Sequence, residues 1–261
     1  MALSQKRNFE PMYLKNFIIQ TGKDLLIRFP KKVARSAEYL NELAKFRELS
    51  DGRFSIDNKD VYPCLSDKIK FTPFDQHYTY HPAWAARKVA EINPAQHVDI
   101  SSILSFSAIV SAFVPVKFYD YRPADLNLPG LDSGFADLKQ LPFESGSIES
   151  LSCMHTIEHI GLGRYGDELD AQGDLKAIAE LKRVTKPGGN ILFVTPVGKP
   201  RIEFNAHRVY SFGQVTNYFS PFTLKEFSLI PDSGGLVQNA DPSLVQQQQY
   251  GCGCFWFKNE A

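Results

Sequence analysis

The segment from Asp137 to Gly198 constrains the fold of this chain more than any other. It contains a short apolar run at 148–154, apolar residues at helical spacing over 175–184, and a run rich in β-branched and aromatic residues at 191–197. The sequence KPGG at 186–189 predicts a basic last turn, a helix stop and a tight turn into the second strand. This order of elements predicts two parallel strands joined by a right-handed crossover.

Similar patterns on both sides of this segment predict an α/β fold. The order of the elements is that of a doubly wound sheet, in which ligands bind outside the carboxyl ends of the strands. The last two strands are expected to form the antiparallel end of a mostly parallel, seven-stranded sheet. The additional strands are expected at 97–101, 116–121, 134–138, 224–230 and 250–258, and the additional helices at 103–113 and 212–219.

Three motifs resemble those of a known class of enzymes. SLSCMHTIEHIGLGRYGD at 150–167, KPGGN at 186–190 and FNAHRVYS at 204–211 look like an uncharacterised family of class I S-adenosylmethionine-dependent methyltransferase-like proteins. This family is often associated with gene clusters for cell-surface polysaccharide biosynthesis. The resemblance covers roughly residues 77–230. It implies a Rossmann-like class I methyltransferase fold, S-adenosylmethionine as the cofactor, and a sugar or another small polar molecule as the methyl acceptor.

The length of 261 residues suits one large α/β domain with an appendage. We expect an N-terminal helical extension with a connector over 1–74 and the methyltransferase-like domain over 75–261. Helical patterning in the extension is accompanied by six basic side chains, which could support peripheral association with an anionic membrane. The alternative is a solvated face on a helical cap. The basic residues are Lys15, Lys23, Arg28, Lys31, Lys32 and Arg35.

The composition narrows the possible partners and the compartment. The formal net charge is zero, whereas nucleic-acid binders usually carry a basic excess, so no nucleic-acid partner is expected. The N-terminal sequence lacks the apolar core of a secretory signal, which predicts a cytoplasmic protein. Cys252 and Cys254 fall on one face of a predicted strand, where core packing is favoured over metal or redox chemistry. The oligomeric state does not follow from the sequence.

The resemblance implies where the cofactor contacts should lie. Asp120 ends the second predicted strand, where an acidic residue of this fold accepts hydrogen bonds from ribose hydroxyls. Asp137 and Leu138 stand where such enzymes contact adenine, and His155 follows the strand at the mouth of the site. The alternatives are a surface-loop role for Asp120 and a turn-capping role for Asp137.

The turn after the first predicted strand departs from the family pattern. Class I methyltransferases have an acidic residue followed by glycines, roughly D-x-G-x-G-x-G, whereas this chain has Asp99 followed by Ser101, Ser102 and Ile103. A positive φ costs more free energy without glycine, and the added side chains occupy space near the cofactor. Two main functions therefore stay open: a methyltransferase, or a protein of the same fold that has lost the cofactor and serves as a binding or scaffolding subunit in surface polysaccharide synthesis. A third alternative is a different reaction at the same pocket, such as sugar transfer or metal-assisted chemistry.

Three residues are candidates for chemistry at the acceptor. His207 is the preferred general base, because an imidazole near neutrality can take a proton from a hydroxyl or an amine. His155 is expected beside the transferred group, and Arg164 could bind a carboxylate or phosphate of an activated sugar. The alternatives are a structural role for His207 and an internal ion pair between Arg164 and Asp167.

The string HTIEH at 155–159 matches the metalloprotease pattern H-x-x-E-H. Zinc binding in that pattern needs both histidines on one face of a helix and a further carboxylate ligand. His155 instead follows directly on a predicted strand, and Gly161 and Gly163 would end any helix soon after it. We therefore expect no metal site.

Overall fold

The computed structural model describes residues 33–260. Contacts within the chain divide it into two units, Met1–Pro73 and Phe74–Ala261. All the basic residues on which the membrane hypothesis rests, except Arg35, lie outside the described residues. Peripheral membrane association therefore stays a prediction.

In the first unit, residues 33–48 are helical, in agreement with the second half of the predicted helical region. An irregular segment follows, with one 3-10 turn at Asn58–Asp60. Lys68 Nζ lies 2.8 Å from Glu38 Oε1 and also contacts the carboxylate of Glu42, one helical turn further on. Arg47 donates a hydrogen bond of 2.6 Å to Asn58 Oδ1. The irregular segment is therefore bonded to the helix of its own unit.

Within the described residues, seven strands of the second unit form one sheet in the order β3-β2-β1-β4-β5-β9-β8. Strands β1 to β5 are parallel to one another, and β9 runs antiparallel to both β5 and β8. The mostly parallel sheet with an antiparallel end is confirmed. The strands are β1 (His97–Ile100), β2 (Val116–Asp120), β3 (Leu131–Phe135), β4 (Ile148–Met154), β5 (Thr185–Val197), β8 (Thr223–Ile230) and β9 (Gly251–Lys258).

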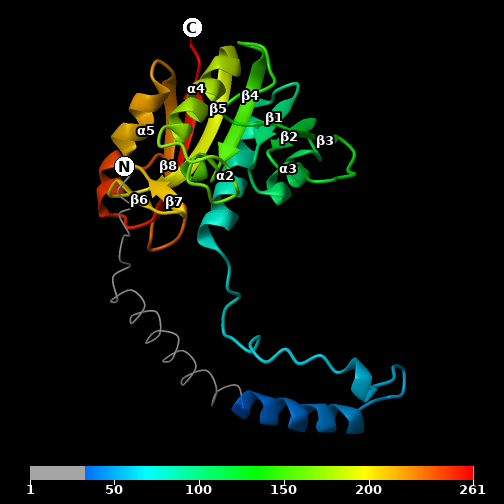
Figure 1. The fold of residues 1–261 in the computed structure, drawn as a ribbon. Coiled ribbons are helices and arrows are strands. Elements are labelled where there is room, and N and C mark those ends of the chain that lie inside the picture. The colour runs from blue at the N-terminus through cyan, green and yellow to red at the C-terminus, as the bar shows by residue number, and fades with distance from the viewer. Residues whose placement is uncertain (1–32, 261) are drawn as a thin grey trace, which may run out of the picture. The chain divides into compact units, whose positions relative to one another are not determined.

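Helices cover both faces of this sheet (Figure 1). On one face α2 (Gln76–Ile92) and α3 (Leu104–Val110) bury side chains such as Trp84 and Phe106 in one core cluster. On the other face α4 (Gly173–Val184) and α5 (Phe212–Phe219) bury theirs in a second cluster. The remaining short elements are η2 (Ile157–His159), β6 (Arg201–Glu203), β7 (His207–Val209) and η3 (Pro242–Gln247).

Two predicted boundaries were wrong. The third strand was expected at 134–138 but spans Leu131–Phe135, because Asp137 begins a turn in which its Oδ1 accepts the Lys139 N–H. The KPGG sequence at 186–189 does not separate helix from strand. The strand β5 starts directly after Val184, and the register between β4 and β5 shifts at this sequence, where Gly188 has a φ of +75°.

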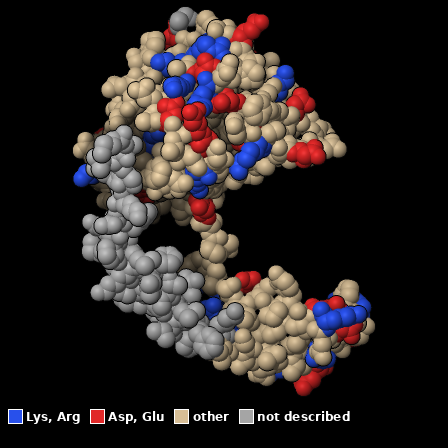
Figure 2. Space-filling model, viewed as in Figure 1, with Lys and Arg blue, Asp and Glu red and all other residues tan. Residues whose placement is uncertain are grey.

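Figure 2 shows acidic and basic side chains interspersed on the visible face of the Phe74–Ala261 unit. None of the helices formed by the described residues combines the length and the apolar character required to cross a lipid bilayer. The carboxyl ends of the parallel strands and the loops that follow them are where the predicted site residues gather.

Candidate functional site

Two adjoining cavities lie at the carboxyl ends of β1, β2 and β4. The first, of about 390 Å³, is lined by five predicted cofactor residues: Ser101, Asp120, Asp137, Leu138 and His155. The second, of about 540 Å³, is lined by all three predicted catalytic residues: His155, Arg164 and His207. Because the two cavities share Ser101, His155, His159 and Tyr165, they are neighbouring parts of one site.

The turn after β1 keeps a left-handed backbone without glycine. Ser101 has a φ of +56°, and its N–H donates a hydrogen bond of 2.7 Å to the carbonyl of Tyr119. The hydroxyl of Ser102 accepts a 3.1 Å hydrogen bond from Met154 N–H, and Ile103 packs partly against the core cluster of α2 and α3. The turn therefore adopts the conformation for which glycine is favoured, while the side chains of Ser102 and Ile103 make contacts with the sheet and helix layers.

Asp99 lies below this turn and lines neither of the two cavities. Its side chain is fully buried, and its two oxygens accept 2.5 Å hydrogen bonds from Ser152 and Ser107. Burial raises the pKa of this carboxyl to about 6, against the opposing effect of the serine hydrogen bonds. The predicted cofactor contact of Asp99 is therefore replaced by internal contacts that join β1, α3 and β4.

Asp120 and Asp137 have the same local arrangement. Asp120 Oδ1 accepts a 2.7 Å hydrogen bond from Arg122 N–H, and Asp137 Oδ1 accepts a 2.8 Å hydrogen bond from Lys139 N–H. Each carboxylate thus caps a turn that begins at a strand end, and both line the first cavity. Asp137 therefore caps a turn, as the alternative predicted, and also lines the first cavity.

His155 lies at the junction of the two cavities. It is the first residue after β4 and has a φ of +54°. Its Nδ1 is 2.8 Å from Glu158 Oε1, and both side chains are almost completely buried. His159 Nδ1 is 2.6 Å from the carbonyl of Ala206, and burial lowers its pKa. The HTIEH sequence forms the bend after β4 and the short 3-10 helix η2, which confirms that its two histidines do not share the face of an α-helix.

The glycine-rich loop after η2 is held by a buried arginine. Arg208 Nη1 donates a 2.7 Å hydrogen bond to the carbonyl of Ile160, and its Nε lies 3.6 Å from Asp174 Oδ2. Asp174 Oδ2 also accepts a 2.9 Å hydrogen bond from the hydroxyl of Tyr210. Arg208, which follows the candidate base in the sequence, therefore has a positioning role.

Arg164 does not form its predicted alternative pair within the described residues. Its Nη1 donates a 3.0 Å hydrogen bond to the carbonyl of Ala206, and its guanidinium carbon is 5.1 Å from the ring centroid of Tyr165. Asp167 instead accepts hydrogen bonds from the N–H groups of Gly161 and Tyr165. Arg164 thus keeps its charge at the second cavity.

His207 begins β7 and lines the second cavity. Its Nε2 lies 3.2 Å from Glu203 Oε2, on the other strand of a two-stranded ribbon, and its ring centroid is 4.7 Å from that of Tyr250. A carboxylate and an aromatic ring therefore flank this imidazole, whose buried Nε2 has no hydrogen-bond partner among the described residues.

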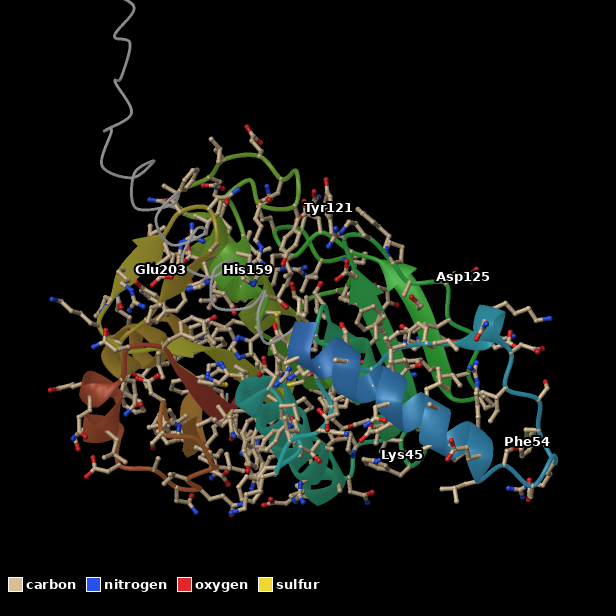
Figure 3. The ribbon with its side chains drawn as sticks, turned by 90° about the horizontal axis from the view of Figure 1, so that it is seen from below. Lys45, Phe54, Tyr121, Asp125, His159 and Glu203 are labelled. Atoms are coloured by element: carbon tan, nitrogen blue, oxygen red, sulfur yellow. The ribbon has the colours of Figure 1, made fainter. Side chains whose placement is uncertain are left out.

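Sequence reasoning missed three aromatic or basic residues that line the cavities: Tyr78, Arg122 and Tyr250. The Arg122 guanidinium lies 4.7 Å from the centroid of the Tyr165 ring. The expected direction of the last strand could have predicted the place of Tyr250. An antiparallel strand begins at the edge of the sheet where the parallel strands end, and Tyr250 directly precedes β9. Figure 3 labels Tyr121 and His159, which line the first cavity, and Asp125, which lines neither cavity.

Comparison with known proteins gives a family model and a set of related structures. Residues 142–228, less than half of the chain, match a family described as a Caenorhabditis protein of unknown function, DUF268. No curated protein matches the chain. The solved structure of YcgJ from Bacillus subtilis has 12% sequence identity and a TM-score of 0.50, with 70% of this chain and 99% of that chain covered.

A protein named as a proposed sarcosine dimethylglycine methyltransferase from Galdieria sulphuraria has 13% identity and a TM-score of 0.50, with 68% of this chain and 84% of that chain covered. Together with the strand order, this decides the fold. The fold is that of a class I S-adenosylmethionine-dependent methyltransferase. The N-methyltransferase NodS from Bradyrhizobium japonicum, solved with S-adenosylhomocysteine, has 12% identity and a TM-score of 0.45, with 70% and 89% of the two chains covered. At these identities the methyltransferase likeness establishes architecture alone.

Proposed function

We propose that the Phe74–Ala261 unit is an S-adenosylmethionine-dependent methyltransferase acting on a small polar acceptor, with sugars as the preferred class. The observation that carries the proposal is the pair of neighbouring cavities. One is lined by Asp120 and Asp137 after two neighbouring strands, and the other by His207 and Arg164. A volume of about 390 Å³ lies within the range of small-molecule sites.

The residues present fit the cofactor. Ser101 already has the left-handed φ of +56° that the turn after β1 requires. The Ser102 hydroxyl accepts a hydrogen bond from the backbone of Met154, and Ser102 lines the second cavity and not the first. Asp120 can accept hydrogen bonds from ribose hydroxyls, and Asp137 can accept one from an adenine amino group. Leu138 adds an apolar contact to the same cavity.

When bound, S-adenosylmethionine supplies a methyl group on a sulfonium, which is already a good leaving group. The remaining work for the chain is alignment of the acceptor. Arg164 would bind a phosphate or carboxylate of the acceptor, and His207 would take the proton from its hydroxyl or amine. His155 lies at the junction of the cavities, beside the position where the two reactants would meet.

The first test is calorimetric titration of the full chain with S-adenosylmethionine and S-adenosylhomocysteine. We expect micromolar binding, and at least about 10-fold weaker binding for Asp120→Ala, since a hydrogen bond to a charged group contributes about 1.5–3 kcal/mol. Asp125→Ala is the matched control, because Asp125 is an exposed carboxylate of the same loop that lines neither cavity.

Equal affinities for the two variants would remove Asp120 from the site. Absence of binding by the folded wild type would favour a binding or scaffolding module that retains the fold alone. A second step is incubation with methyl-labelled S-adenosylmethionine and a panel of nucleoside diphosphate sugars. Label transfer would identify the acceptor class, and the association with polysaccharide synthesis depends on this result.

A further inference from the structure

The histidines of this chain are concentrated at one place in the fold. All six lie among the described residues; four of them contact Glu158 or Tyr250 at the carboxyl edge of the sheet, and a fifth, His81, contacts the ring of His155. They come from α2, the end of β4, η2 and the start of β7. These five are His77, His81, His155, His159 and His207.

His155 presents an unpartnered nitrogen. Its Nδ1 is 2.8 Å from Glu158 Oε1, and a carboxylate at this distance accepts the Nδ1 proton. In the neutral imidazole, Nε2 then carries a lone pair. Within the described residues this buried Nε2 has no hydrogen-bond partner, although only 4% of the His155 side chain is exposed. A histidine held by a carboxylate through one nitrogen is the arrangement that orients metal ligands in proteins.

Two further residues with donor atoms lie close to His155. His77 comes from the first turn of α2, and Cys252 comes from the start of β9. One ligand atom of each of His77, His155 and Cys252 lies within 4.8 Å of the other two. Tetrahedral zinc with bonds of about 2.0–2.3 Å separates its ligand atoms by about 3.5 Å, so small side-chain rotations would close the site.

His81 adds an independent observation on the same helix face. Its Nδ1 is 2.7 Å from the carbonyl of His77, which fixes the proton on Nδ1. Its Nε2 is also buried without a hydrogen-bond partner in the part of the chain that the structure describes, and its ring centroid is 5.0 Å from that of His155. The space under the start of α2 thus holds two imidazole lone pairs that the protein itself does not satisfy.

We propose that His77, His155 and Cys252 bind one divalent transition-metal ion, for which Zn²⁺ has the best-matched chemistry. Imidazole and thiolate ligands suit zinc, whereas magnesium and calcium require oxygen ligands. On binding, the Cys252 sulfur forms a bond to the metal and its thiol proton leaves to solvent. Three protein ligands leave the fourth position of a tetrahedral ion for water or the acceptor. His155 also lines the second cavity, from which either could enter.

This site differs from the metalloprotease pattern in the sequence. His159, the second histidine of that pattern, has its Nδ1 bonded to the carbonyl of Ala206, and Glu158 orients His155. The metal would join α2, β4 and β9 at the rim of the second cavity. The inference is independent of methyl transfer, since its test measures metal binding alone.

The test uses the full chain without an affinity tag, under reducing conditions, stripped with a chelator. Competition with a chromophoric chelator measures Zn²⁺ affinity, and Co²⁺ substitution reports thiolate ligation by its charge-transfer absorption. We expect one ion per chain and a thiolate band in the wild type. Cys252→Ser should lose the band and at least about 100-fold in affinity, and Glu158→Gln should lose about 10- to 100-fold with the band retained.

The matched control is Cys254→Ser, which changes a buried cysteine two residues further along the same strand, outside the three-residue group. It should bind like the wild type. His77→Ala, at a half-buried residue, provides a second ligand variant in case Cys252→Ser does not fold, which circular dichroism would detect. A wild type without zinc affinity, or ligand variants that bind like the wild type, would overturn the proposal.

Discussion

The two sides of the site are built in different ways. On the side of β2 and β3, Asp120 and Asp137 each cap a turn by accepting the N–H of the residue two positions further on, Asp120 at the end of β2 and Asp137 two residues after β3. On the side of β4 and β9, the site depends on His155, on a helix that precedes the sheet and on the last strand of the chain. The first side is made of local interactions, and the second is made by tertiary packing.

This difference shows which residues of the site can be predicted from a sequence motif. A strand end followed by an acidic residue can be recognised within a few residues, and both acids do line one cavity. The cluster of His77, His155 and Cys252 carries no contiguous motif. The only local signal is the spacing of His77 and His81, which places both on one face of α2.

The comparison can be tested most strongly at His207. If the β4 side carries the chemistry and the β2 side the cofactor, His207→Ala should lower turnover by about 10²- to 10⁴-fold, because a general base contributes this much. Affinity for S-adenosylhomocysteine should not change. The measurements are label transfer to the acceptor found in the nucleotide-sugar panel, and calorimetry. A parallel loss of affinity and turnover would instead make His207 structural.

A substitution of Arg208 tests the packing on the β4 side of the site. Arg208→Ala leaves the buried carboxylate of Asp174 without its cation, and removing one partner of a buried pair costs about 3–5 kcal/mol. We expect a lower free energy of unfolding in urea. Arg201→Ala on the neighbouring strand is the control, since its pair with Glu203 is exposed and should contribute at most about 1 kcal/mol. Similar losses for the two variants would contradict the assigned role.

Asp99, on β1 between the two sides, allows the buried contacts beneath the site to be tested by pH. Its folded pKa of about 6 lies above the usual 3.8, so the protonated form is favoured by folding. This contribution to stability is fully present below about pH 4 and is lost as the pH rises through about 6, with a total of about 3 kcal/mol. Asp99→Asn removes the titration.

Between pH 4 and pH 7 the free energy of unfolding of the wild type should therefore fall relative to that of Asp99→Asn. Thermal unfolding of both proteins at several pH values measures it, and the difference cancels the titration of other groups. If the stabilities of the two proteins change with pH in the same way, Asp99 does not titrate in this range.

The smallest effect is expected at Ser101. Because Ser101 has a φ of +56°, Ser101→Gly should relieve backbone strain and change the free energy of unfolding by no more than about 1 kcal/mol. Ser101→Ala keeps the Cβ and serves as the control. We expect unchanged or tighter binding of S-adenosylmethionine to the glycine variant. Weaker binding would mean that the serine hydroxyl itself contacts the cofactor.

Much of the fold could be predicted because its signals are periodic and local. The strands at 148–154 and 250–258 and the helix at 212–219 agree with the structure to within one residue. The third strand was misplaced because the turn at Asp137 ends the pairing earlier than its apolar neighbours suggest. The internal contacts of Asp99 could not be predicted either, since Ser107 and Ser152 meet it only after α3 and β4 have packed.

The sequence by itself determined the order of the elements, the mostly parallel sheet and the placement of Asp120 at the end of the second strand, because these follow from hydrophobic period and turn chemistry. The tertiary structure alone decided that Ser101 keeps a left-handed turn, that Arg208 holds the loop after η2, and that His77 and Cys252 meet His155. Each of these depends on contacts between residues far apart in the chain, which no local pattern encodes.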